Sequence, residues 1–224
     1  MRPIEYILAF LAPYDCLICG TEGRLLCVLC AEDAFEPVPS RCYRCFAMSR
    51  DSAVCDRCRP SSRLKHVWIG TEYDGSAKRL IRLLKYERAR MAARPIAERI
   101  LESLPYLPAH TIITHIPTAT SRHRARGYDQ AELIAKIIAK QLGLRHAALL
   151  ERFGQTRQVG STKQQRIAQA AEMFRINMPE HTAGASVLLI DDILTTGASV
   201  ESAAKILKTA GAKEVNAAVF AQKH

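Results

Sequence analysis

Hydrophobic and polar positions follow one regular pattern from residue 67 onward, in which short apolar runs alternate with segments of helical spacing. The pattern predicts strands over 67–73, 112–116, 187–190 and 215–220, and helices over 76–90, 127–142 and from about 199 to 210. Residues 187–190 are all apolar, which is typical of a central parallel strand covered on both faces. We therefore expect a three-layer α/β domain with a central, mainly parallel sheet over residues 64–224.

The first 60 residues have a different character and form the other predicted unit. An apolar run over 6–12 follows Arg2, but it is far shorter than the ~20 residues that span a bilayer, and no small-residue cleavage site follows it. Ile4, Ile7, Leu8 and Leu11 have the spacing of an amphipathic helix instead. We expect a helix here, no membrane span and a cytoplasmic location.

The charge of the chain narrows the choice of ligands. Its 224 residues include 32 Lys and Arg against 22 Asp and Glu, a formal charge of +10, and 48% are hydrophobic. The hydrophobic content argues against complete disorder. The positive charge would attract phosphates, either on a nucleotide or along a nucleic-acid backbone.

All eight cysteines lie between residues 16 and 58, in four CxxC units. A two-residue spacer allows one tight turn to direct both sulfurs at a tetrahedral metal, and reduced thiols in the cytoplasm more often bind metal than form disulfides. The spacing favours two structural zinc sites with sequential pairing: Cys16, Cys19, Cys27 and Cys30 in one, and Cys42, Cys45, Cys55 and Cys58 in the other. Interleaved pairing, and iron in place of zinc, stay open. Six arginines surround the second group and either contact phosphates or form a solvated face: Arg41, Arg44, Arg50, Arg57, Arg59 and Arg63.

Residues 187–199, with the sequence VLLIDDILTTGAS, combine a buried strand, two carboxylates and a small-residue loop that leads into a helix. Free amides at a helix N-terminus favour a phosphate group, and Gly197 permits close approach of the backbone. Asp191 and Asp192 are placed to accept hydrogen bonds from ribose hydroxyls and are the candidate catalytic residues. The predicted ribose-phosphate site comprises Asp191, Asp192, Thr195, Thr196, Gly197, Ala198 and Ser199. The segment resembles the phosphoribosyl diphosphate signature of type I phosphoribosyltransferases.

Further motifs extend the resemblance along most of the chain. They are YDG at 73–75, LLKY at 83–86, RARGYDQAEL at 124–133 and QVGS at 158–161, all behind the paired CxxC units. Together they are similar to the ComF/GntX family. The resemblance implies a type I phosphoribosyltransferase fold behind a double zinc ribbon, and a link to DNA uptake or to the handling of single-stranded DNA. Two departures stand out: Asp129 where the family has Asn, and Thr118-Ala119 where it more often has Leu-His.

Analogy with type I enzymes assigns further roles. The loop after the 112–116 strand would hold diphosphate together with Mg²⁺, with Thr118, Thr120, Arg122 and Arg126 as candidate contacts and Lys85 as a weaker one. Gln158, Lys163 and Arg166 would belong to a lid over the reacting centre. His115, Tyr128 and Trp68 are expected to be packing residues.

Three functions remain compatible with these residues. The first is a protein that binds phosphoribosyl diphosphate or a related ribose phosphate in competence, with single-stranded DNA and other DNA-uptake proteins as further partners. The second is an active phosphoribosyltransferase that releases diphosphate, in which positioning and charge would supply most of the catalysis. The third is a zinc-ribbon scaffold or regulator with a ligand-sensing pocket.

Overall fold

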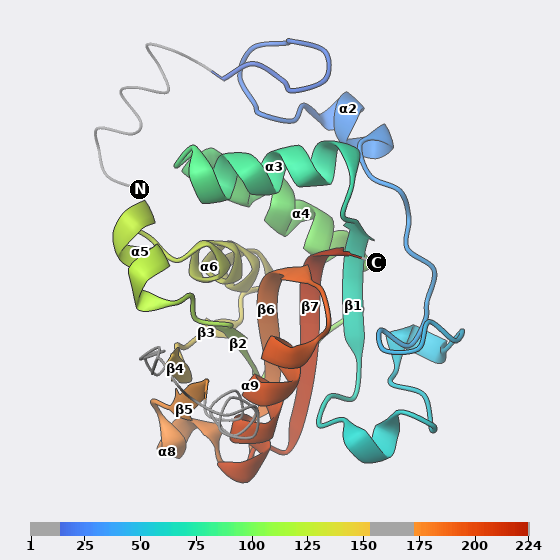
Figure 1. The fold of residues 1–224 in the computed structure, drawn as a ribbon, viewed down its shortest axis with the longest axis vertical. Helices are drawn as coiled ribbons and strands as arrows, with labels where there is room; N and C mark the ends of the chain where they lie inside the picture. Colours follow the sequence, from blue (N-terminus) through green and yellow to red (C-terminus); the bar gives the residue numbers. More distant parts are fainter. Residues whose placement is uncertain (1–13, 153–172, 224) are drawn as a thin grey trace, which may run out of the picture.

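A computed structural model describes residues 14–152 and 173–223 (Figure 1). Five parallel strands form the central sheet in the order β1-β7-β6-β2-β3. They are β1 (Val67–Glu72), β2 (Thr111–His115), β3 (Arg145–His146), β6 (Ser186–Leu194) and β7 (Glu214–Gln222). A separate antiparallel pair consists of β4 (Leu150–Arg152) and β5 (Phe174–Ile176). The predicted α/β class and the parallel sheet are confirmed.

Helices cover both faces of this sheet. The longer ones are α3 (Gly75–Tyr86), α4 (Ala93–Ser103), α6 (Gln130–Leu142) and α9 (Ala198–Thr209). The shorter ones are α2 (Val28–Asp33), α5 (Thr120–Arg126), α8 (Pro179–Thr182), η1 (Arg50–Ser52), η2 (Arg59–Ser61) and η3 (Arg90–Ala92). Within the described ranges, no helix has the length and apolar character needed to cross a bilayer.

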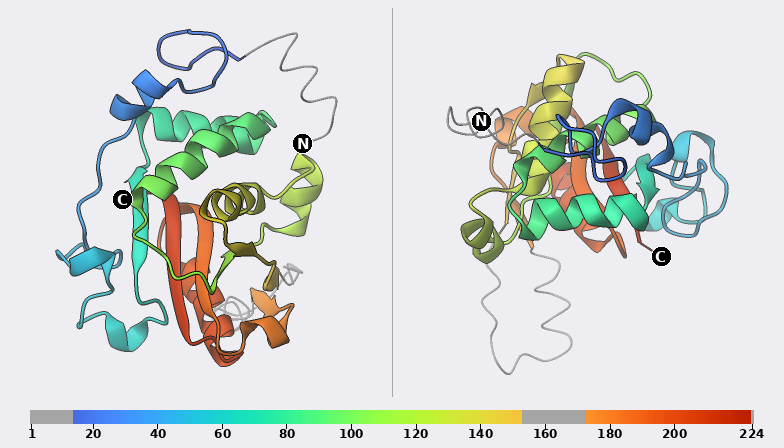
Figure 2. Two further views of the ribbon diagram at one scale, coloured as in Figure 1. Left: turned by 180° about the vertical axis from the view of Figure 1, so that it is seen from behind. Right: turned by 90° about the horizontal axis from the view of Figure 1, so that it is seen from above.

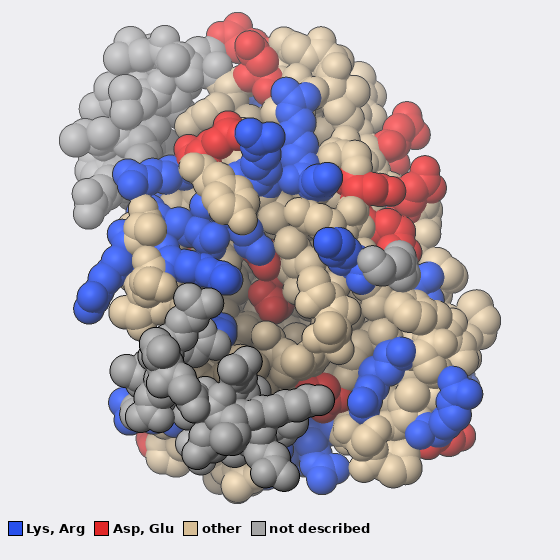
Figure 3. All heavy atoms as spheres, viewed as in Figure 1, with Lys and Arg blue, Asp and Glu red and all other residues tan. Residues whose placement is uncertain are grey.

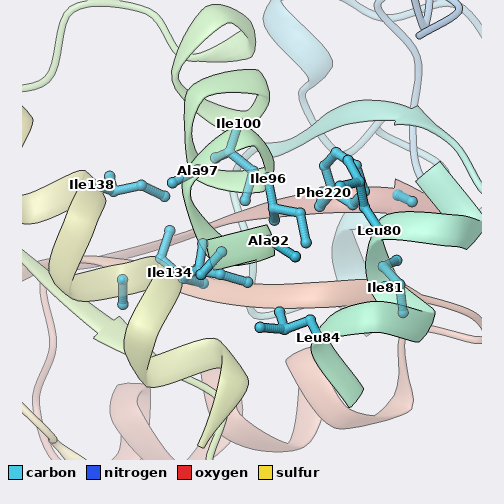
Figure 4. Close-up of a cluster of buried hydrophobic side chains, with 14 of the residues drawn as sticks. Leu80, Ile81, Leu84, Ala92, Ile96, Ala97, Ile100, Ile134, Ile138 and Phe220 are labelled. Carbon is cyan, nitrogen blue, oxygen red and sulfur yellow. The ribbon is translucent and has the colours of Figure 1, made fainter. Parts of the chain in front are cut away.

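The side chains of β6 alternate between two hydrophobic cores. Leu188 and Ile190 pack with α3, α4 and α6, whereas Val187 and Leu189 pack with α9 on the opposite face. In the first core, isoleucines and leucines of the three helices belong to one hydrophobic cluster with Phe220 of β7 (Figure 4). This two-sided burial explains the continuous apolar run at 187–190 and confirms the three-layer arrangement.

Several element boundaries differ from those that the pattern predicts. The predicted helix over 127–142 begins at Gln130, because Gly127 adopts a left-handed conformation (φ 79°) that ends the short helix α5. The predicted helix over 76–90 ends at Tyr86. Strand β6 continues through Leu194, so Asp191 and Asp192 lie within its last half and not beyond its end. The predicted helix in residues 1–13 lies outside the described part of the chain.

The two cysteine ribbons pack against different sides of the domain (Figure 2). The first ribbon lies over α3, where Arg79 donates to the carbonyl of Leu17 at 2.9 Å. Phe35, which follows it, packs edge-on against Phe220 with ring centroids 5.4 Å apart. The second ribbon lies beside β1 and contributes Cys42, Tyr43 and Val54 to the core under α9. Each ribbon therefore contributes to one of the two hydrophobic cores of the α/β domain. The domain boundary near residue 60 stays a prediction.

Candidate functional site

The predicted phosphate loop connects β6 to α9. Gly197 is the residue before the helix, has a left-handed backbone (φ 76°) and carries no capping side chain, while the amide of Ala198 donates to Thr196 Oγ1 at 3.4 Å. Thr195, Thr196 and Ala198 are exposed, and Ser199 is partly exposed. The amides of this loop and the positive end of a 12-residue helix are thus available to an anionic group.

Two carboxylates precede this loop on β6. Asp192 is 4% exposed, Asp191 is partly buried, and the amide of Asp192 donates to Asp191 Oδ1 at 2.8 Å. Burial, and then the neighbouring charge of Asp192, raise the pKa of Asp191 well above its usual value. Lys85 Nζ lies 2.7 Å from Asp192 Oδ2 in an ion pair whose side chains are 16% and 5% exposed. Lys85 therefore compensates one of the two charges.

Lys85 also lines a basic pocket of about 470 Å³ between α3, α5 and the start of α6. Its lining consists of Lys85, Tyr86, Arg88, Arg122, Ala125, Arg126 and Gln130. Arg122 and Arg126, two predicted diphosphate contacts, are brought together there. Figure 3 shows clustered Lys and Arg side chains beside acidic atoms in a hollow of this face.

The loop before α5 is held by the N-terminus of α6. Asp129 accepts hydrogen bonds from the amides of Thr118 (2.6 Å), Ala131 (2.9 Å) and Glu132 (3.3 Å). Gln130 Nε2 donates to Thr118 Oγ1 at 2.9 Å, so this hydroxyl already has a partner. All contacts of Asp129 are with donors, which a carboxylate satisfies as well as an amide oxygen. The departure from Asn therefore leaves the loop intact.

Two arginines that the sequence analysis missed fix the other end of α5. Arg88 Nη2 donates to the carbonyl of Ala125 at 2.9 Å, and Arg90 Nη2 donates to that of Gly127 at 3.3 Å. Arg88 has a positive φ of 55°, which turns the chain after α3 toward the pocket. The pattern of the sequence carries no sign of this turn, since it extends the helix through the same residues.

Arg152, at the end of β4, is a further missed cation. Its guanidinium is half-buried, and burial and then the charge of Arg122 lower its pKa. The carboxylates of Asp191 and Asp129 act in the opposite direction. Arg152 therefore shares an electrostatic environment with both the acidic pair and the basic pocket.

The remaining residues named in the sequence analysis are exposed, buried or outside the described part of the chain. Thr120 begins α5 on an exposed position and does not line the pocket. Trp68, His115 and Tyr128 are 7%, 5% and 6% exposed, which confirms them as packing residues. The predicted lid residues Gln158, Lys163 and Arg166 lie outside the described residues.

The cysteines form two clusters with the predicted sequential pairing. In each cluster the four sulfurs lie within 4.8 Å of one another. The sulfurs of Cys19 and Cys27 are 3.7 Å apart, and those of Cys45 and Cys55 are 3.5 Å apart. A tetrahedral zinc with Zn–S bonds of about 2.3 Å requires sulfur separations of about 3.8 Å, whereas a disulfide requires about 2.05 Å. Both clusters therefore fit a tetrahedral ion such as zinc.

Local hydrogen bonds favour the ionised, metal-binding form of two thiols in each cluster. The amide of Ala47, and then the side chain of Arg57, lower the pKa of Cys45 to about 6. Burial opposes ionisation of Cys16, but backbone amides, including that of Cys27, lower its pKa to about 6. Thiolates are the metal-binding form, so these contacts favour coordination at neutral pH.

Comparison with known families supports the class that this fold and site define. The model of the phosphoribosyl transferase domain matches residues 129–224, from the N-cap of α6 through β7. The segment contains the acidic pair and the phosphate loop. This part of the chain is therefore similar to a phosphoribosyltransferase domain.

Several relatives match the chain over nearly its full length. The chain is 27% identical to "DNA utilization protein YhgH" of Salmonella typhi over 220 residues, 91% of this chain and 94% of that protein. It is 24% identical to "Competence protein ComFC" of Streptococcus pneumoniae over 206 residues, 89% and 88% of the two chains. The ComFC of Bacillus subtilis is 26% identical over 231 residues, 86% and 92% of the two chains. The chain is thus similar to YhgH and ComFC proteins over most of its length.

The two cysteine clusters predict two metal ions per chain. We expect about two zinc ions per chain in freshly prepared protein, because each closed four-cysteine site needs its own ion. Elemental analysis measures this, and the ultraviolet-visible spectrum distinguishes iron, which would absorb in the visible range. A stoichiometry of one zinc or less, or substantial iron, would contradict the prediction.

The raised pKa of Asp191 predicts an unusual dependence of stability on pH. Since the folded state disfavours its charge, native stability should fall as pH rises from the ordinary pKa of 3.8 through the raised folded value. Asp191→Asn should therefore increase the free energy of unfolding by about 1 kcal/mol at pH 8, a size common when a functional site is relieved of strain.

Urea denaturation of both proteins with their metal bound, at pH 4 and pH 8, measures this difference. The gain should vanish at pH 4, where Asp191 of the folded protein is already neutral. An equal difference at both pH values would show that the substitution acts through something other than the carboxylate charge.

Proposed function

We propose that the protein binds phosphoribosyl diphosphate, or a related ribose phosphate, with Mg²⁺, and acts in the uptake or handling of DNA. The ion pair of Lys85 with Asp192 is the observation that carries the proposal. It joins the acidic pair before the phosphate loop to the basic pocket, so that one continuous site offers partners for each part of such a ligand.

Each part of the ligand has complementary chemistry in this site. The 5′-phosphate would accept hydrogen bonds from the amides at the N-terminus of α9. The ribose hydroxyls would donate to Asp191 and Asp192. The diphosphate would lie in the basic pocket, where the forked guanidinium groups of Arg122 and Arg126 suit phosphate oxygens. Thr118 would donate through its hydroxyl, because that oxygen only accepts from Gln130 and the amide of Thr118 is already bonded to Asp129.

Magnesium fits the acidic end of the site. Mg²⁺ is usually bound by one or two carboxylates together with substrate phosphates, and it neutralises their charge. Asp191 is the available carboxylate, since Asp192 is paired with Lys85. The raised pKa of Asp191 makes a nearby cation favourable, because the cation stabilises the ionised form.

The DNA-related part of the proposal rests on the relatives and on charge. Relatives named for competence and DNA utilization match the chain over most of its length. The chain carries a formal charge of +10, and basic side chains gather around the pocket (Figure 3). Such a surface attracts the backbone of single-stranded DNA. Enzymatic transfer of the phosphoribosyl group would use the same pocket, and screening nucleobases for diphosphate release tests it.

Calorimetry with phosphoribosyl diphosphate and Mg²⁺ tests the ligand site. We expect the native chain to bind, and Asp191→Asn/Asp192→Asn to lose binding at least a hundredfold, because the hydrogen-bond acceptors for the ribose are weakened and the Mg²⁺ ligand is removed. Asp56→Asn, at an exposed position of the second ribbon, should bind like the native chain. The proposal fails if the native protein, shown to be folded and metal-loaded, does not bind.

Fluorescence anisotropy with a labelled oligothymidine tests the nucleic-acid surface. The logarithm of the association constant should fall linearly with the logarithm of salt concentration, by about 0.7 per phosphate contact. Arg122→Ala/Arg126→Ala should reduce this slope by about 1.4, whereas Lys213→Ala, at the opposite edge of the sheet, should leave it unchanged. A salt-independent isotherm would argue against backbone binding.

A further inference from the structure

The second cysteine ribbon contacts the phosphate loop directly, through Tyr43. This residue lies inside a metal-binding knuckle, between Cys42 and Cys45, and is 4% exposed. Its ring occupies the space beside Gly197, where an added Cβ atom would lie only 2.7 Å from Tyr43 Cε2. Gly197 thus has two reasons to lack a side chain, its left-handed φ of 76° and the ring packed against it.

A hydrogen bond extends this contact into the first turn of α9. The hydroxyl of Tyr43 donates to Glu201 Oε1, and the amide of Glu201 in turn donates to the carbonyl of Gly197 at 3.0 Å. Glu201 Oε2 accepts from the amide of Arg63 at 3.0 Å, so both oxygens are engaged. Burial, and then Glu201, raise the pKa of Tyr43 above its ordinary value. The phenol therefore stays protonated as the donor throughout the physiological range.

The backbone of the same knuckle is attached to the sheet. Gln222 Nε2 donates to the carbonyl of Tyr43 at 3.1 Å. Arg41 Nη2 contacts Gln222 Oε1 at 3.3 Å and Glu72 Oε1 at 2.6 Å, at the ends of β7 and β1. The knuckle is thus held at the carboxyl edge of the sheet, the same edge from which the phosphate loop departs.

We propose that Tyr43 is a positioning residue through which the second cysteine cluster holds the phosphate loop in its ligand-binding conformation. The inference rests on the proposed binding of a ribose phosphate. A metal ion in this cluster orders the knuckle, the knuckle orders the Tyr43 ring, and the ring restricts Gly197 and its neighbours. Pre-ordered loop amides bind an anion more tightly, because less conformational entropy is lost on binding.

Thermodynamic linkage makes this coupling reciprocal. If the metal strengthens ligand binding by way of Tyr43, the ligand must strengthen retention of the metal by the same factor. The effect should be confined to the second cluster. The first cluster packs in the other core, with Cys16, Leu25 and Leu26 on the side of α3, and provides an internal reference.

Two probes separate the loop from the rest of the site. Ribose 5-phosphate carries the phosphate that the loop would bind, whereas inorganic diphosphate with Mg²⁺ reports on the basic pocket. Tyr43→Ala should weaken ribose 5-phosphate binding about tenfold, and Tyr43→Phe, which removes only the hydrogen bond to Glu201, about threefold. Diphosphate affinity should be unchanged in both. Met48→Ala, exposed on the same ribbon, should affect neither.

Metal retention supplies the second measurement. Equilibrium competition of the native protein with a chromogenic chelator should resolve two metal affinities, one for each cluster. Saturating ribose 5-phosphate should raise one of them about tenfold in the native protein and in Met48→Ala, and should raise neither in Tyr43→Ala.

The outcomes distinguish this inference from the proposed function. If the native protein binds neither ribose 5-phosphate nor phosphoribosyl diphosphate, the proposed function fails. If the native protein binds and folded Tyr43→Ala binds ribose 5-phosphate equally well, the positioning role is overturned. If Tyr43→Ala does not fold, the native protein decides: a ligand that binds without raising either metal affinity overturns the coupling.

Discussion

Strand β6 is enclosed on both faces, and the layers of the protein are arranged around this constraint. Leu188 and Ile190 face one core, and Val187 and Leu189 face the other, so helices must cover the sheet on both sides. The apolar run ends where the strand reaches Asp191 and Asp192, so both carboxylates lie toward its carboxyl end. The acidic pair and the phosphate loop thus lie at the edge that the two cores leave open.

Opposite charges at this edge stabilise each other. Two adjacent carboxylates in a partly buried site would repel, and Lys85 relieves this repulsion by pairing with Asp192. The same lysine begins a row of cations that continues through Arg122 and Arg126 around the pocket. A ligand with a polar sugar and several phosphates matches both signs of charge, whereas a neutral ligand would leave them uncompensated.

The two ribbons illustrate different uses of the same small motif. Each cluster has the geometry of a closed tetrahedral site, which contributes folding energy and leaves no open coordination position. The first packs over α3 on the side of Phe220, away from the phosphate loop. The second places Tyr43 against Gly197 of the phosphate loop. Position in the fold, and not the cysteine spacing, distinguishes the two.

The sequence by itself determined the features that depend on local pattern: the buried strand at 187–190, the acidic pair followed by a glycine loop, and the sequential pairing of the cysteines. Tertiary structure decided what depends on long-range contacts. The ion pair of Lys85 joins residues more than 100 positions apart, and the guanidinium of Arg88 donates to α5. Tyr43 meets Gly197 only when the second ribbon packs on the sheet. Local patterns report burial and backbone preference, whereas such contacts form only when distant segments pack together.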